Sequence, residues 1–212
     1  MATIAQSDLS PNYAFLDPHG GKSDLNRIAS RSALIVACHD PIGRIFVRYA
    51  WAGRCATPML MTKIEQAIER YAVKTFGVEV DGLAGLWADA MRVNAALRLK
   101  RLPLMSVNQP KDMEKIWRIR TTLQPVISRG MLFLDMHDPG QIELKNELTG
   151  FPRSVRLDMV DALASLIRHV IPPVRSQPEV DLRKDSTLKY LRDTGATSKQ
   201  IEQYFQQRGG RP

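Results

Sequence analysis

The sequence has few of the residues that build disulfide frameworks, zinc sites or membrane spans. Its 212 residues include two cysteines, Cys38 and Cys55, which form no CxxC pair, and four histidines without a ligand-like cluster. A disulfide framework and a zinc finger are therefore unsupported, and a zinc hydrolase is disfavoured. No apolar run approaches the roughly 20 residues that cross a bilayer. The N-terminus lacks a basic stretch followed by an apolar one, so no secretory signal is indicated.

Several short enzyme motifs are also missing. There is no GxxxxGK[ST], so the chain has no P-loop of its own, and neither GxGxxG nor GxSxG occurs. The composition, with 44% hydrophobic and 25% charged residues, is that of an ordinary globular protein and excludes disordered and fibrous classes. The length fits one domain with a small appendage.

Positive charge is in excess. Thirty Lys and Arg against 22 Asp and Glu give a formal net charge of +8. A basic surface favours polyanions, which are nucleic acid, an anionic membrane or an acidic partner. The same excess also serves solubility alone, and it says nothing about catalysis.

The order of apolar and polar segments predicts a mixed α/β domain. Strands expected at 13–16, 32–38 and 44–51 are joined by short connections, which is typical of an antiparallel meander. Helices and strands then alternate, which predicts a mixed sheet with helices on its faces. The expected helices are 57–71, 83–99, 111–128, 142–148 and 158–170, and the expected later strands are 76–80, 102–107 and 131–134.

Three regions are expected along the chain. Residues 1–12 are interpreted as a leader, 13–171 as the main domain, and 172–212 as a linker followed by a helical hairpin tail. The linker is indicated by its prolines and the hairpin by two short apolar stripes, 188–191 and 201–205. The hairpin could contact DNA, dock on a partner or pack on the main domain.

Four carboxylates stand out by context. Asp17 ends an apolar strand and Glu79 lies within one, while Asp158 and Asp161 open an apolar helix and share one of its faces. Each has an ordinary alternative, such as a turn cap, a solvent-facing strand position or a favourable place at a helix N-terminus. Together they predict an oxygen-only site for Mg²⁺ or Mn²⁺. A pair of such ions catalyses attack of water on a phosphodiester.

Five segments in sequence order resemble the nuclease domain of the phage terminase large subunit. The resemblance covers about residues 13–170. Two positions depart from the family pattern: Asp81 stands where Asn is commoner, and Leu157 stands where the first Asp of a pair is often found. The five segments are 15–18 with 23–24 and 32–36, then 79–82, then 115–120 with 123–130, then 147–152, and finally 157–164.

The resemblance implies a fold, a site and a reaction. The fold is RNase H-like, with an antiparallel three-strand meander, further parallel strands and flanking helices. Asp17, Glu79 and Asp158 would be the catalytic residues, with Asp17 bridging two Mg²⁺ or Mn²⁺ ions and the other two each holding one. Asp161 would support the metal site directly or through water. The activity would be endonucleolytic cutting of double-stranded DNA during viral genome packaging.

Basic residues are expected to follow the DNA backbone, where they add a salt-dependent term to affinity. A solvated helix face is the alternative interpretation of the same residues. His19 and Lys22 lie in the loop after Asp17, where either could touch the scissile phosphate. The expected DNA-binding residues are Lys22, Arg98, Lys100, Arg101, Lys111, Lys115, Arg118 and Arg120.

The resemblance also implies partners. These are double-stranded DNA, a portal ring, the small terminase subunit and an ATPase domain that this chain does not contain. We expect a monomeric domain without membrane contact, acting in the host cytoplasm and not retained in the virion. Two other functions remain open: an RNase H-like resolvase or transposase-type nuclease, and a catalytically silent module that binds DNA or docks on the packaging motor.

Overall fold

The computed structural model describes residues 9–18, 31–80, 89, 103–109 and 113–172. All of them belong to the first of two units into which the chain divides, Met1–Val174. Most of the predicted leader, the predicted helix at 83–99 and the predicted hairpin tail lie outside the described residues.

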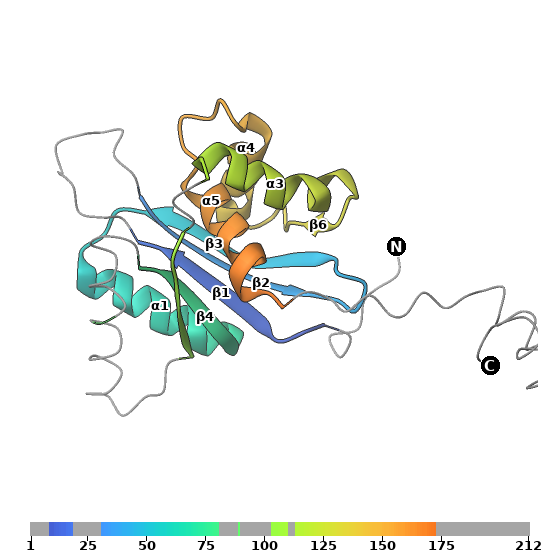
Figure 1. Ribbon diagram of the computed structural model, residues 1–212. Coiled ribbons are helices and arrows are strands. Elements are labelled where there is room, and N and C mark those ends of the chain that lie inside the picture. The colour runs from blue at the N-terminus through green and yellow to red at the C-terminus, as the bar shows by residue number, and fades with distance from the viewer. Residues whose placement is uncertain (1–8, 19–30, 81–88, 90–102, 110–112, 173–212) are drawn as a thin grey trace, which may run out of the picture. The chain divides into compact units, whose positions relative to one another are not determined.

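Six strands of the described residues form one mixed sheet (Figure 1). Their order across the sheet is β5-β4-β1-β2-β3-β6. Strand β2 is antiparallel to β1 and to β3, whereas β4 is parallel to β1, β5 to β4 and β6 to β3. The strands are β1 (Asn12–Asp17), β2 (Ser32–His39), β3 (Ile45–Gly53), β4 (Val73–Glu79), β5 (Leu104–Val107) and β6 (Leu132–Phe133).

The strand order identifies the fold. A meander of β1, β2 and β3 is followed by β4 and β5, which lie on the other side of β1 and run parallel to it. The parallel return from β3 to β4 requires a crossover, which α1 (Thr57–Tyr71) supplies. This order, with β2 as the antiparallel strand, is that of an RNase H-like α/β fold, so the expected fold class is confirmed.

Helices cover both faces of the sheet (Figure 1). Helix α1 packs on one face, and α3, α4 and α5 pack on the other. Among the described residues no helix is both long and apolar enough to span a membrane. The helices of the second face are α3 (Lys115–Ser128), α4 (Pro139–Gly150) and α5 (Asp158–Ser165), which continues as the π-helix η3 (Leu166–Val170).

The central strand β1 shows why both faces are buried. Successive side chains of a strand point to opposite faces. Leu16 therefore joins the apolar cluster that contains Ile64 of α1, while Phe15 joins the cluster that contains Leu163 of α5. Both strand residues are fully buried. A strand covered on both sides is a continuous apolar run, which is how β1 and β2 read in the sequence.

Several predicted boundaries differ from the observed ones for local reasons. Helix α4 begins at Pro139, not at residue 142, because the Asp138 side chain accepts the backbone N–H of Gln141 and caps the helix. Strand β4 begins at Val73, not at residue 76, because α1 ends at Tyr71 and the next residue, Ala72, reverses the chain with a left-handed φ of 46°. The helix predicted at 158–170 changes its hydrogen-bond pattern after Ser165.

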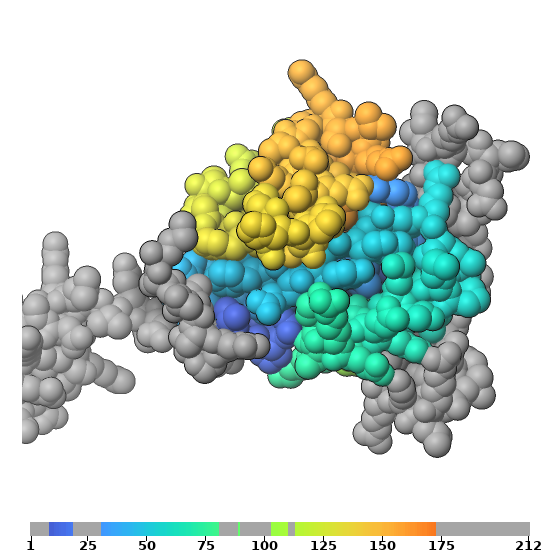
Figure 2. Space-filling model, turned by 180° about the vertical axis from the view of Figure 1, so that it is seen from behind, coloured from blue at the N-terminus to red at the C-terminus, as the bar shows by residue number. Residues whose placement is uncertain are grey.

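Seen from behind, the helices of the two faces stand on either side of the strands. In Figure 2 the residues of α4, in yellow to orange, and those of α1, in turquoise, flank the light-blue band of β2 and β3.

The turn between strands β2 and β3 is held by Asp40, whose Oδ1 accepts the backbone N–H groups of Ile42 and Arg44. This turn lies at the end of the sheet opposite to the predicted carboxylate site.

Candidate functional site

The four predicted carboxylates come from three elements that meet at one end of the sheet. Asp17 is the last residue of β1 and Glu79 the last of β4. These strands are parallel neighbours in which Leu16 pairs with Val78, so the two acidic residues follow at adjacent strand ends. Open α/β sheets bind their ligands outside the carboxyl ends of parallel strands.

Helix α5 brings the other two carboxylates to this end. Its first turn carries Asp158 and Asp161, and the helix packs against β1 and β2. Asp161 is buried, and Asp158 is 9% exposed. The charges of both act on the carboxyl of Asp17. The structure therefore brings together the four residues that the sequence singled out, although Glu79 ends its strand and does not lie within it as expected.

Asp17 is the electrostatic centre of this cluster. Burial raises its pKa well above the usual range, and the charges of Glu79, Asp161 and Asp158 raise it further. The ammonium of Lys115 acts in the opposite direction but does not compensate. A carboxyl in such surroundings is poorly stabilised as an anion, and a bound cation would relieve the repulsion among the acidic side chains.

Asp161 is held by two basic residues of α3. Its Oδ1 accepts a hydrogen bond from Arg118 Nη2 at 2.6 Å, and its Oδ2 lies 2.9 Å from Lys115 Nζ. Burial disfavours the charge of Lys115, but Asp161, together with Asp17 and Asp158, raises its pKa above the ordinary value. A side-chain cation thus lies among the carboxylates.

Two further residues contact the cluster, and neither is predicted from the sequence. Arg31, immediately before β2, donates from Nε to Asp158 Oδ2 at 3.2 Å. Gln109, just after β5, donates from Nε2 to Glu79 Oε2 at 3.1 Å and to Ser165 Oγ at 2.9 Å. The predicted meander contained a signal for Arg31: an antiparallel second strand begins where the first ends, which places Arg31 beside Asp17.

The donors of the site fit a hard divalent cation by their chemistry. All four side chains offer carboxylate oxygen, which Mg²⁺ and Mn²⁺ prefer, and Lys115 shows that positive charge is favoured between them. As the side chains lie, however, no three Asp, Glu, His or Cys residues in the described part of the chain are grouped closely enough to hold a metal ion. Asp158 and Asp161 face basic side chains instead.

The predicted DNA-binding residues are only partly described. Lys115 and Arg120 are exposed on α3, whereas Arg118 is 7% exposed and directs its guanidinium to Asp161. Arg118 therefore joins α3 to α5 and does not extend an exposed basic row. The other predicted residues lie outside the described part of the chain: Lys22, Arg98, Lys100, Arg101 and Lys111.

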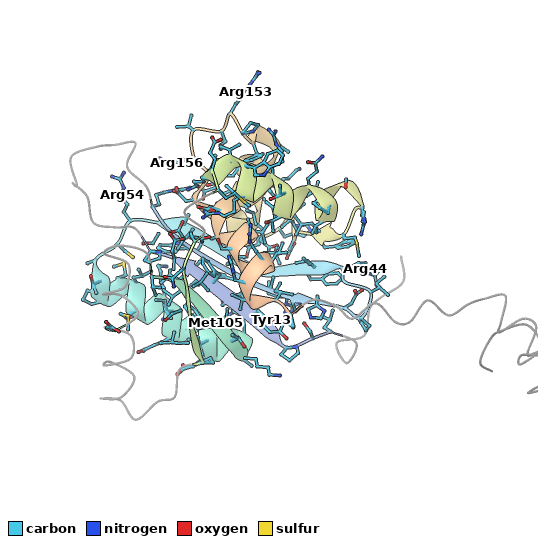
Figure 3. All side chains as sticks on the ribbon, in the orientation of Figure 1. Tyr13, Arg44, Arg54, Met105, Arg153 and Arg156 are labelled. Atoms are coloured by element: carbon cyan, nitrogen blue, oxygen red, sulfur yellow. The ribbon has the colours of Figure 1, made fainter. Side chains whose placement is uncertain are left out.

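Exposed arginines that the sequence analysis did not single out also flank the cluster. Arg54 follows the end of β3, where Gly53 pairs with Ser32, and Arg156 precedes Asp158 by two residues. Figure 3 shows both on the same side of the molecule, while Arg44 lies at the other end of the sheet. Two exposed arginines therefore lie at the same end of the sheet as the acidic cluster.

The fold and this cluster together define an RNase H-like α/β domain with four carboxylates at the carboxyl ends of its central parallel strands. No family model and no curated protein matches the chain. Among solved structures it is similar to a mutant nuclease domain of the large terminase subunit gp2 of bacterial virus Sf6, determined with manganese and beta-thujaplicinol. The identity is 14%, over 77% of this chain and 90% of that chain, with a TM-score of 0.47.

The chain is also similar to T. thermophilus RuvC. One structure is a complex with Holliday junction substrate, at 12% identity over 72% of this chain and 89% of that chain, with a TM-score of 0.42. The other is Thermus thermophilus RuvC at 13% identity over 72% and 88%, with a TM-score of 0.41. A terminase nuclease domain is thus among the solved structures to which this chain is similar.

Proposed function

We propose that this chain is a divalent-metal-dependent endonuclease of the RNase H-like type that cuts double-stranded DNA. The observation that carries the proposal is the convergence of Asp17 and Glu79, at adjacent strand ends, with Asp158 and Asp161 of α5. The charges of the other three raise the pKa of the Asp17 carboxyl, and a bound cation would relieve that repulsion. The exposed arginines at this end of the sheet, Arg54 and Arg156, favour a polyanionic substrate.

The resemblance to the terminase nuclease domain gives each carboxylate a role. By that resemblance Asp17, on which the charges of the other three act, would be shared between two Mg²⁺ or Mn²⁺ ions. Glu79, which accepts a hydrogen bond from Gln109, and Asp158, which Arg31 contacts, would each hold one ion. Asp161 supports the site through Lys115 and Arg118. Bound metal would activate water and stabilise the leaving 3′-oxygen.

A place in viral genome packaging is the finer part of the proposal. It rests on the five terminase-like segments, which occur in the order of that family. The partners would then be double-stranded DNA, a portal ring, a small terminase subunit and an ATPase domain, in the host cytoplasm.

Plasmid cleavage tests the activity. With Mn²⁺ or Mg²⁺ the purified protein is expected to convert supercoiled plasmid into nicked and linear forms, and EDTA is expected to stop the conversion. Intact plasmid across full titrations of both metals would contradict the enzyme proposal and favour a silent DNA-binding module. A four-way junction compared with a linear duplex of the same sequence separates a packaging nuclease from a resolvase, because only the resolvase prefers the junction.

Phosphate contacts by the flanking arginines can be measured separately. Arg54→Ala combined with Arg156→Ala is expected to weaken DNA binding at low salt. It should also reduce the slope of log K against log salt concentration by about 2, since each lost phosphate contact removes about 1. Fluorescence anisotropy with Ca²⁺ at several salt concentrations gives the slope. Arg129→Ala is the matched control, because Arg129 is exposed at the far end of α3. An unchanged slope in the double variant would favour a solvated surface.

A further inference from the structure

The first turn of α5 depends on another helix for its N-terminal hydrogen bonds. Within the described residues its N-cap, Leu157, supplies no side-chain acceptor. Instead Oε2 of Glu147, on α4, accepts the backbone N–H groups of Met159 at 3.0 Å and Val160 at 3.2 Å. Two of the amides that a helix start leaves unsatisfied are thereby bound by a buried carboxylate. The backbone that carries Asp158 is consequently tied to α4.

Arg31 completes the link between α4 and Asp158. Its Nη2 lies 2.7 Å from the second oxygen of Glu147, and its Nε donates to Asp158 Oδ2 at 3.2 Å. Its Nη1 contacts Glu143, also on α4, at 2.5 Å. Three nitrogens of one rigid guanidinium thus address three carboxylates, a geometry that a lysine ammonium cannot reproduce. Arg31, Glu147 and Asp158 are each less than a tenth exposed.

Stability alone does not account for this network. Removing charges from water costs several kcal/mol for each ion, and buried ion pairs often contribute little net free energy of folding. Burial raises the pKa of Glu147 even though Arg31 and the α5 amides stabilise its anion. What the network supplies is geometry, since it fixes both the backbone of α5 through Glu147 and the side chain of Asp158 through Arg31.

We propose that Arg31 and Glu147 are positioning residues that hold Asp158 in place for binding of a divalent cation beside Asp17. The inference rests on the proposed nuclease function and adds two residues to its site. Outer partners that orient metal-binding side chains typically change metal affinity by 10–100-fold when they are mutated. The expected loss of affinity is of that size.

The test is Mn²⁺ affinity, measured by electron paramagnetic resonance of free Mn²⁺ in titrations of the metal-free protein. Arg31→Lys keeps the positive charge but loses the planar guanidinium with its several N–H donors. Glu147→Gln keeps an oxygen that can accept the α5 amides but loses the negative charge that faces Arg31. Both are expected to bind Mn²⁺ about 10–100-fold more weakly than the wild type. Glu143→Gln is the matched control, because Glu143 shares Arg31 but its side chain is 44% exposed, and its hydrogen bond and ion pair are to Arg31 and not to α5. Its affinity should remain within about threefold of the wild type.

The outcomes separate this inference from the proposed function. Wild-type affinity in folded Arg31→Lys and Glu147→Gln, with or without a lower thermal midpoint, would reduce the network to a structural one and overturn the inference. Circular dichroism identifies the folded variants, and Glu147→Gln decides alone if Arg31→Lys does not fold. A wild type that binds Mn²⁺ but leaves DNA intact would contradict only the nuclease proposal, and one that binds no Mn²⁺ would contradict both.

Discussion

Asp17→Asn is expected to abolish DNA cleavage while making the metal-free protein more stable. The loss of activity should be at least about 10³-fold, equivalent to about 4 kcal/mol, because the variant removes the carboxylate on which the charges of the other three act. Plasmid cleavage under Mn²⁺ measures it. The gain in stability follows from the electrostatics of the folded state and has a definite dependence on pH.

The sign of that dependence comes from the raised pKa of Asp17. Burial, followed by the charges of Glu79, Asp161 and Asp158, makes the folded protein hold this proton more tightly than the unfolded chain does. Stability is therefore lost as pH rises from the unfolded pKa, about 3.9, through the folded pKa, and the loss persists above it. Asparagine removes this cost, so the advantage of the variant should grow from pH 4 upward.

Calorimetry in EDTA between pH 4 and pH 8 measures the difference in thermal midpoint. A rise of a few °C at pH 8 is expected, since 1 kcal/mol corresponds to roughly 2–4 °C for a domain of this size. Asp40→Asn is the control of opposite sign. Although burial opposes it, hydrogen bonds from Arg44 lower the pKa of Asp40, so its replacement should lower the midpoint at neutral pH. A variant at Asp17 that cuts DNA at the wild-type rate would contradict the assignment of the site.

The core of the sheet follows directly from the sequence, but the contacts that complete the site do not. The apolar runs around Phe15 and Ile35 predict buried strands, and the short turn at Asp40 predicts the antiparallel pairing of β2 with β3. The meeting of Asp17 with Glu79 depends on the parallel pairing of β1 with β4, which local periodicity does not reveal. That part of the site came from the family resemblance.

Arg118 shows a second limit of predicting the site from the sequence. It was expected on an exposed basic face, yet it is buried beside Ile119, because Asp161 on another helix offers it a partner. Helix α4 shows the same effect. Its apolar Ile142 is 39% exposed, while the polar Gln141 and Glu147 are buried and hydrogen-bonded. Patterns that equate apolar with buried fail where a distant residue satisfies a polar side chain.

Gly140→Ala is expected to destabilise the protein by about 3 kcal/mol, near the upper end of overpacking costs. Gly140 lies in the first turn of α4, where the helix meets β3, and an added Cβ would collide with the carbonyl oxygen of Ala50. That atom belongs to the backbone of a paired strand and cannot rotate away. The start of α4 would have to move, and Glu147 would move with it, so Mn²⁺ affinity should fall together with stability.

Urea denaturation measures the change, and Gly150→Ala provides the control at the other end of the same helix. There a Cβ would lie 3.1 Å from the Cβ of Ser154, in an exposed turn that can shift by a few tenths of an ångström. The control is expected to cost less than about 1 kcal/mol. Equal stability of the two variants would mean that α4 does not need its close approach to β3.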